Sequence, residues 1–216
     1  MKGINKVINI TKKNYISDQE EFWAGEFGTD YIVRNKGNKI LASNLNFFSK
    51  ALSQAGNLEN CIEFGANVGM NLRALKLLYP NIKIDAIEIN KNAVDELKKL
   101  GGRVYFGSIY DYIPKDTFDL VLIKTVLIHI NPEYLKLVYQ KLYDSTNRYI
   151  LLCEYYNPTQ VAVTYRGHEE RLFKRDFAGE MLDIFTDLSL VDYGFNYHRD
   201  EAFPQDDINW FLLKRE

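Results

Sequence analysis

Short apolar runs alternate with amphipathic segments along most of the chain. Runs such as "NCIEF", "KIDAIEI", "FDLVLIK" and "RYILLCEY" are mostly apolar and predict strands that are buried on both faces. Segments between them, such as "MNLRALKLLYP" and "NAVDELKKLG", have apolar residues at helical spacing. A regular alternation of strand and helix predicts a parallel sheet with helices on both faces.

The two ends of the chain depart from this alternation. Residues 1 to about 17 are expected to form a loosely ordered polar lead. Ser17, followed by Glu20, has a capping-box pattern, and "NKILASNLNFFSKALSQAG" predicts a helix that ends near Gly56. The final stretch, "LVDYGFNYHRDEAFPQDDINWFLLKR", predicts two strands joined by a loop around Pro204. Because no helical pattern separates these two strands, we expect an antiparallel pair at one edge of the sheet.

These elements together predict a Rossmann-like, doubly wound α/β fold. The expected sheet has seven strands, six of them parallel and one an antiparallel edge strand. Residues 1–56 are expected to form the lead and an N-terminal helical cap. Residues 57–216 are expected to form the core, with an acceptor-binding insertion at about 154–180.

Composition and charge exclude several classes of protein. A formal net charge of -2 gives no surplus of positive charge for nucleic-acid binding. No apolar run reaches the roughly 18 residues that a membrane span needs, and "MKGINKVINITKK" lacks the apolar core of a secretory signal. Cys61 and Cys153 lie in apolar runs, as expected for buried, reduced thiols of a cytoplasmic protein. The three histidines and two cysteines lack the spacing of metal ligands, so no metal site is expected.

The stretch "IEFGANVGMN" carries the strongest functional signal, because it joins a predicted strand to a predicted helix. Gly65 and Gly69 allow a tight turn and let a ligand approach the backbone. The next strand ends in Glu88, and an acid about 20 residues after such a loop is suited to hold ribose hydroxyls. The loop does not read Gly-x-Gly-x-x-Gly, as a dinucleotide site does, and it lacks the Gly-Lys-Ser/Thr of a phosphate-binding loop. Glu63 beside the glycines favours a cationic ligand end over a pyrophosphate.

With "GSIYD" and "FDLVLIKTVLIHI" after them, these motifs resemble the class I S-adenosylmethionine-dependent methyltransferases over roughly residues 58–155. The resemblance implies that the chain binds S-adenosylmethionine and releases S-adenosylhomocysteine. It places Glu88 on the ribose, Ile89 against the adenine and Ser108 at the adenine edge, although many members of the family carry Asp where this chain has Ser108. The residues that it places along the cofactor are Glu63, Gly65, Ala66, Gly69, Glu88, Ile89, Ser108, Ile109 and Lys124.

A narrower resemblance extends over about residues 17–214. The segments "EEFWAGEFGTDYIVRN" and "EYYNPTQVAVTYRGHEERLFKRDFAGE" are similar to methyltransferases associated with pseudaminic acid biosynthesis. This resemblance implies a small polar acceptor, with a hydroxyl or amine of a nonulosonic acid or nucleotide sugar as the methylated group, in surface-glycan biosynthesis. The partner is then a small molecule and not a nucleic acid.

The segment from Cys153 to Phe177 follows the fifth predicted strand, where acceptors bind in such folds. Arg166 can bind a carboxylate or phosphate through two parallel hydrogen bonds. The charges around it can equally pair with one another on a solvated face, and the tyrosines can equally pack in the core. The residues that we predict to bind substrate are Arg166, Tyr155, Tyr156, Tyr165 and Lys174.

Three residues are candidates for catalysis, because a hydroxyl acceptor gains from a nearby base. His168 lies in the polar segment, and its alternative is an exposed loop histidine. Glu154, an acid at the carboxyl end of the fifth predicted strand, is a candidate for a base or for a substrate ligand. His129 follows the fourth predicted strand, where packing beside the cofactor is the alternative. Tyr31 and Arg34 are expected to reach the methionine carboxylate from an N-terminal lid.

The sequence leaves two other functions open. One is a methyltransferase of a protein or of another small-molecule acceptor. The other is a non-catalytic scaffold that binds S-adenosylmethionine; intact loop glycines and Glu88 argue against a fold that has lost its cofactor.

Overall fold

The computed structural model describes residues 7–9, 15–165 and 168–216. Within these ranges it describes the backbone alone for residues 7–9, 33, 164–165 and 168–171. Arg166, one of the predicted substrate-binding residues, lies outside the described residues.

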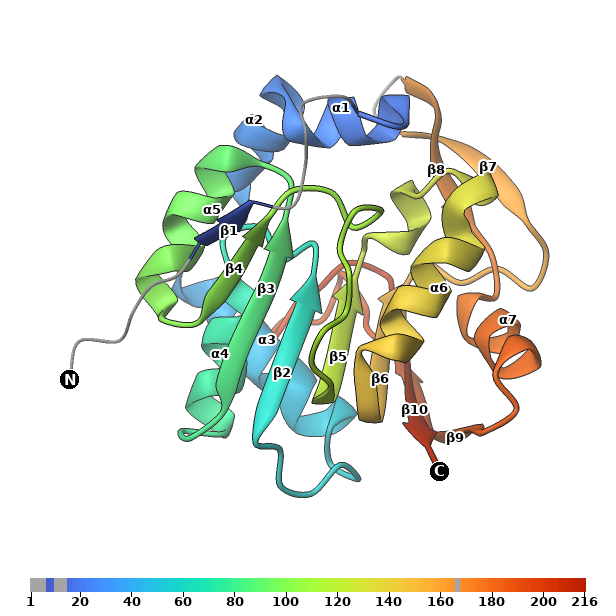
Figure 1. Cartoon of the computed structure of the whole chain (residues 1–216). Helices are drawn as coiled ribbons and strands as arrows, with labels where there is room; N and C mark the ends of the chain where they lie inside the picture. The colour runs from blue at the N-terminus through green and yellow to red at the C-terminus, as the bar shows by residue number, and fades with distance from the viewer. Residues whose placement is uncertain (1–6, 10–14, 166–167) are drawn as a thin grey trace.

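A single sheet of eight strands forms the centre of the molecule, in the order β1-β4-β3-β2-β5-β6-β10-β9 (Figure 1). Neighbouring strands from β1 to β6 are parallel, whereas β10 is antiparallel to both β6 and β9. The strands are β1 (Val7–Asn9), β2 (Asn60–Phe64), β3 (Lys83–Glu88), β4 (Arg103–Phe106), β5 (Phe118–Lys124), β6 (Thr146–Glu154), β9 (Leu188–Phe195) and β10 (Asn209–Arg215).

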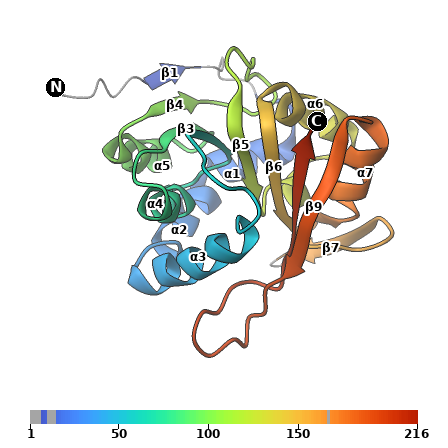
Figure 2. The same ribbon diagram turned by 90° about the horizontal axis from the view of Figure 1, so that it is seen from below.

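Helices cover both faces of this sheet, and each face has its own apolar core. Adjacent strand residues serve opposite faces: on β2, Cys61 packs in one core and Ile62 in the other. Helices α3 (Asn38–Ala51), α4 (Met70–Leu78) and α5 (Lys91–Leu97) lie on the Cys61 side. Helices α6 (Leu135–Asp144) and α7 (Phe177–Ile184) lie on the Ile62 side (Figure 2). Burial on both faces explains why the strands read as apolar runs instead of alternating patterns.

The N-terminal cap consists of α1 (Asp18–Ala24) and α2 (Glu26–Arg34), which cross the carboxyl ends of the strands (Figure 1). The predicted cap at Ser17 is confirmed, because its hydroxyl oxygen accepts a hydrogen bond from the Glu20 backbone nitrogen. The carboxylate of Glu20 accepts from the Ile16 backbone nitrogen instead of completing the capping box at Ser17.

The doubly wound fold and the antiparallel pair at one edge are confirmed, with two changes to the expected sheet. The sheet has an eighth strand, because residues 7–9 pair in parallel with β4, and the expectation of a loosely ordered lead was wrong there. Three residues are too few to give a recognisable strand pattern. The antiparallel strand is β10, and it lies one place in from the edge, between β6 and β9.

The predicted insertion contains a second, two-stranded sheet. Strands β7 (Val161–Tyr165) and β8 (His168–Lys174) form an antiparallel hairpin before α7. Leu172 and Phe173 of β8 are buried, and Leu172 packs in the core on the Ile62 side of the larger sheet. Asp176 caps α7 by accepting a hydrogen bond from the Gly179 backbone nitrogen.

Candidate functional site

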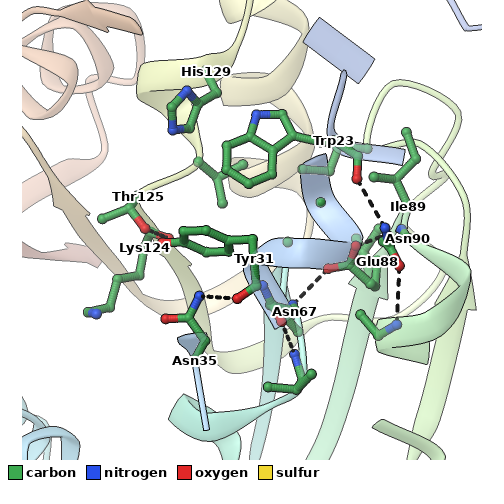
Figure 3. Close-up of a pocket in the computed structure, with 18 of the residues that line it drawn as sticks. Trp23, Tyr31, Asn35, Asn67, Glu88, Ile89, Asn90, Lys124, Thr125 and His129 are labelled. Atoms are coloured by element: carbon green, nitrogen blue, oxygen red, sulfur yellow. Dashed lines mark hydrogen bonds between the residues drawn. The ribbon is translucent and has the colours of Figure 1, made fainter. Parts of the chain in front are cut away.

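A cavity lies at the carboxyl ends of β2, β3, β4 and β5, beneath α1 and α2 (Figure 3). Ligands of open α/β sheets bind at this edge, where the loops that follow the strands leave a crevice. The described residues form three 3-10 turns, η1 (Lys98–Leu100), η2 (Leu127–His129) and η3 (Pro132–Tyr134), and η2 supplies a lining residue, His129. The predicted site residues that line the cavity are Tyr31, Gly65, Ala66, Glu88, Ile89, Ser108, Ile109, Lys124 and His129.

The glycine turn between β2 and α4 requires glycine at both of its ends. Gly65 and Gly69 have φ angles of 74° and 75°, in the left-handed region. A Cβ at Gly65 would lie 2.7 Å from the Val126 Cγ2 atom, and a Cβ at Gly69 would lie 2.5 Å from the Leu100 Cδ1 atom. The Gly65 and Ala66 backbone nitrogens donate to the Ile87 carbonyl oxygen at 2.9 and 3.1 Å. This turn therefore holds a fixed position beside the end of β3.

Glu88 ends β3 with a buried carboxylate that backbone groups orient. Its Oε2 accepts from the Asn67 backbone nitrogen and its Oε1 from the Asn90 backbone nitrogen, both at 2.7 Å. Burial raises the pKa of Glu88, and the backbone hydrogen bonds from Asn90 and Asn67 offset part of this effect. Each carboxylate oxygen has a further lone pair, so Glu88 can still accept hydrogen bonds from a ligand in the cavity.

Glu63 lies below the glycine turn and outside the described lining of the cavity. Its side chain is 1% exposed, and its Oε1 accepts from the Asn71 Nδ2 at 2.6 Å. Its Oε2 has no hydrogen-bond partner among the described residues. Burial raises the pKa of Glu63 to about 8, although the Asn71 hydrogen bond and the charge of Lys124 lower it. A buried carboxyl group with one free oxygen, whose ionised form a nearby positive charge favours, suits the underside of a site for a positively charged ligand group.

We expect this carboxyl group to make stability depend on pH. The pKa of Glu63 is higher in the folded state than the ordinary value near 4.5, so the folded state binds more protons between about pH 5 and pH 8. The free energy of unfolding should therefore fall as pH rises across this range. Glu63→Gln should reduce that fall by about 1 kcal/mol or more. Urea unfolding at pH 5, 6.5 and 8 measures it.

Glu133→Gln, at an exposed position, is the matched control. Part of the fall in the free energy of unfolding with rising pH should persist in Glu63→Gln, because burial also raises the pKa of Glu154 to about 8. A fall in Glu63→Gln equal to that of the wild type would contradict the expectation.

Asn90 fastens the helical cap to the sheet. Its Oδ1 caps α5 by accepting from the Asn92 and Ala93 backbone nitrogens at 3.0 and 3.3 Å. Its Nδ2 lies 3.3 Å from the Trp23 carbonyl oxygen and 3.2 Å from the Thr29 Oγ1. One buried side chain therefore positions both α5 and the junction between α1 and α2.

Aromatic side chains of the cap close the cavity from above. The ring centroid of Trp23 lies 4.7 Å from that of His129 and 5.3 Å from that of Tyr31. Figure 3 shows Trp23 and His129 together, with the Tyr31 ring extending toward Thr125 and Lys124. Burial raises the pKa of the Tyr31 hydroxyl, so it stays a neutral hydrogen-bonding group. Arg34 is exposed, lies outside the described lining, and places its guanidinium carbon 5.6 Å from the Tyr31 ring centroid.

The three predicted catalytic residues have different surroundings. His129 lines the cavity on η2. Glu154 lies behind this turn: its Oε1 accepts from the Val126 and Leu127 backbone nitrogens at 2.9 and 2.8 Å, and its Oε2 from Ile128 at 3.4 Å. The Glu154 carboxylate therefore holds the turn that carries His129. The backbone of His168 begins β8, and its side chain lies outside the described part.

Two of the predicted substrate-binding tyrosines, Tyr155 and Tyr156, have described side chains, and neither lines the cavity. Tyr155 is half-buried, and the Lys174 Nζ lies 5.2 Å from its ring centroid. Tyr156 is 40% exposed, with its ring centroid 6.1 Å from that of Phe211. The side chain of Tyr165 lies outside the described part.

Three polar residues that were not predicted from the sequence also line the cavity: Asn35, Asn44 and Asp206. The loop between β9 and β10 supplies Asp206 and extends on the side of α3 (Figure 2). Its Gln205 Nε2 donates to the Asn44 Oδ1 at 2.8 Å. No sequence pattern links this loop to α3, since the hydrogen-bonded residues are 161 positions apart.

The described residues contain no group of three or more His, Cys, Asp or Glu side chains that could hold a metal ion. None of the described helices combines the length and the apolar character that crossing a membrane requires. Cys61 and Cys153 are buried free thiols, as predicted.

Comparisons with known proteins show the fold. No family model matches the sequence, and no curated protein matches it significantly. The structure is similar to magnesium protoporphyrin IX methyltransferase from Synechocystis, with a TM-score of 0.68, 12% identity, and coverage of 94% of this chain and 100% of that one. It is also similar to an S-adenosylmethionine-dependent methyltransferase from Leishmania major (TM-score 0.67, 16% identity, 92% and 81% coverage) and to mitomycin 7-O-methyltransferase (TM-score 0.67, 13% identity, 93% and 61% coverage). The chain therefore has the class I methyltransferase fold.

Proposed function

We propose that the protein is an S-adenosylmethionine-dependent methyltransferase that acts on a small polar acceptor. The observation that carries this proposal is the orientation of Glu88 beside the glycine turn. Two backbone nitrogens hold its carboxylate at the cavity, where its remaining lone pairs can accept both hydroxyls of a ribose.

The other groups of the cavity fit S-adenosylmethionine better than a phosphorylated nucleotide. Among the described lining residues, Lys124 is the one Lys or Arg, whereas Glu20, Glu88 and Asp206 supply carboxylates. Acidic groups favour the positive charge of a sulfonium and repel phosphate. Solved neighbours of the same fold carry S-adenosylmethionine, S-adenosylhomocysteine or sinefungin, which supports this choice.

When bound, S-adenosylmethionine supplies a methyl group on a positively charged sulfur. The contribution of the protein is to position the acceptor and exclude water, which supplies much of the rate of such a displacement. For a hydroxyl acceptor, a ring nitrogen of His129 takes the proton as the oxygen–methyl bond forms. Glu154 acts indirectly, by holding the η2 turn from which His129 projects.

For the acceptor we propose a carboxylated sugar of the nonulosonic type. Lys124, Thr125, Tyr31 and Asn35 lie together at the end of the cavity away from Glu88 (Figure 3). The Lys124 ammonium can pair with a carboxylate, and the amide and carboxylate groups near it can bind hydroxyls. The solved neighbours include methyltransferases of a porphyrin, a mitomycin and a glycopeptide, so the fold alone does not select the acceptor.

The acceptor proposal is tested by methyl transfer from labelled S-adenosylmethionine to a panel of nonulosonic acids, nucleotide sugars, neutral sugars and peptides. We expect labelled product with the carboxylated sugars. Lys124→Met should raise KM for such an acceptor by about tenfold or more and leave the affinity for S-adenosylhomocysteine nearly unchanged.

Lys136→Met, at an exposed position of α6, is the matched control. If Lys124→Met weakens S-adenosylhomocysteine binding and spares KM, Lys124 belongs to the cofactor side. Transfer to peptides or neutral molecules alone would contradict the acceptor class.

A further inference from the structure

Glu20 brings a buried carboxylate from the helical cap into the cavity. Its side chain is 8% exposed and lines the cavity from α1. Its Oε1 accepts a hydrogen bond from the Ser108 hydroxyl, and its Oε2 accepts from the Ile16 backbone nitrogen at 2.7 Å. Neither partner is a cation, so two neutral donors fix the orientation of this carboxylate.

Ser108 has little capacity left for a ligand once it holds Glu20. Its hydroxyl hydrogen goes to Glu20, and its oxygen accepts from the Tyr110 backbone nitrogen at 2.9 Å. The side chain that can still accept a hydrogen bond from a ligand at the end of β4 is therefore the carboxylate of Glu20. It has lone pairs beyond those that accept hydrogen bonds from Ser108 and Ile16.

Apolar surface for a flat ring lies next to this carboxylate. Ile109 follows Ser108, Ile89 follows Glu88, and both isoleucines line the cavity. The same part of the cavity thus combines a site for ribose hydroxyls, apolar side chains, and a second carboxylate that can only accept hydrogen bonds when ionised.

We infer that Glu20 recognises the 6-amino group of adenine and makes the site selective for this base. This inference rests on the proposed function. A carboxylate accepts a hydrogen bond from an amino group, whereas the 6-oxo group of hypoxanthine would face it as a second acceptor. The cap helix α1, and not the sheet alone, then determines which base is bound.

Calorimetry with S-adenosylhomocysteine and S-inosylhomocysteine tests this inference. The wild type should bind the adenine ligand at least about tenfold more tightly. Glu20→Gln should bring the ratio of the two affinities close to one, because an amide can donate to a 6-oxo group. Ser108→Ala, which leaves Glu20 in place but removes the hydroxyl that orients it, should lower the ratio part of the way.

Glu21→Gln removes an exposed carboxylate from the same helix and should keep the wild-type ratio. Simple loosening of α1 would weaken both ligands by the same factor, so an unchanged ratio in Glu20→Gln would overturn the inference. Wild-type protein that binds neither ligand would instead overturn the proposed function, and the inference with it. Urea unfolding of each variant verifies that it folds.

Discussion

Glu88→Ala should weaken the binding of S-adenosylhomocysteine by about 100-fold or more. The substitution removes the carboxylate that accepts hydrogen bonds from both ribose hydroxyls, and hydrogen bonds to a charged group contribute about 1.5–3 kcal/mol each. It also leaves the Asn67 and Asn90 backbone nitrogens without their acceptor at the rim of the cavity. Titration calorimetry of the folded variant measures the loss.

The matched control is Asp95→Ala, which removes an exposed carboxylate from the helix that follows Glu88. This control should bind S-adenosylhomocysteine as the wild type does. The affinity of Glu88→Gln for S-adenosylhomocysteine should lie between those of Glu88→Ala and Asp95→Ala. Its amide keeps one oxygen that accepts hydrogen bonds but turns an NH2 group toward a backbone N–H. A Glu88→Ala affinity within about threefold of the wild type would remove the observation on which the proposed function rests.

Glu154→Ala should lower the free energy of unfolding by about 3 kcal/mol or more. The side chain is 3% exposed and accepts hydrogen bonds from three successive backbone nitrogens of residues 126–128. Loss of this acceptor leaves three donors of the η2 turn unpaired in the interior, and each such group costs about 1–3 kcal/mol. Urea denaturation at one fixed pH measures the difference.

The same variant should also lose methyl-transfer activity, because the η2 turn carries His129. Glu133→Ala, at an exposed position of η3, should change neither property. If Glu154→Ala keeps wild-type stability while transfer is lost, Glu154 has a direct catalytic role, as its place after the fifth strand first indicated, and our structural interpretation is wrong.

The sequence was sufficient for seven of the eight strands and for the part of the cavity around the glycine turn, because the signals there are local. The turn from Gly65 to Gly69 lies between a strand and a helix that each read clearly, and Glu88 ends the next strand. These residues meet because the carboxyl ends of parallel strands share one edge of a sheet. Their meeting at one edge of the sheet could therefore be predicted before any contact was known.

Contacts across long stretches of chain could not be predicted in this way. Glu20 meets Ser108 across 88 positions, and Gln205 meets Asn44 across 161. Such pairs leave no periodic pattern in the sequence. Glu20, which faces the end of β4, and the polar lining residues Asn35, Asn44 and Asp206 were therefore not predicted. Glu154 was read as a candidate base from its strand-end position, which does not show that backbone nitrogens occupy both of its oxygens.

The most direct test of the proposed function is titration calorimetry of the wild-type protein with S-adenosylhomocysteine, with NAD and ATP titrated in parallel. We predict one binding site with a dissociation constant in the micromolar range for S-adenosylhomocysteine and much weaker binding of NAD and ATP. Absence of S-adenosylhomocysteine binding at millimolar concentration, or tighter binding of NAD or ATP, would contradict it.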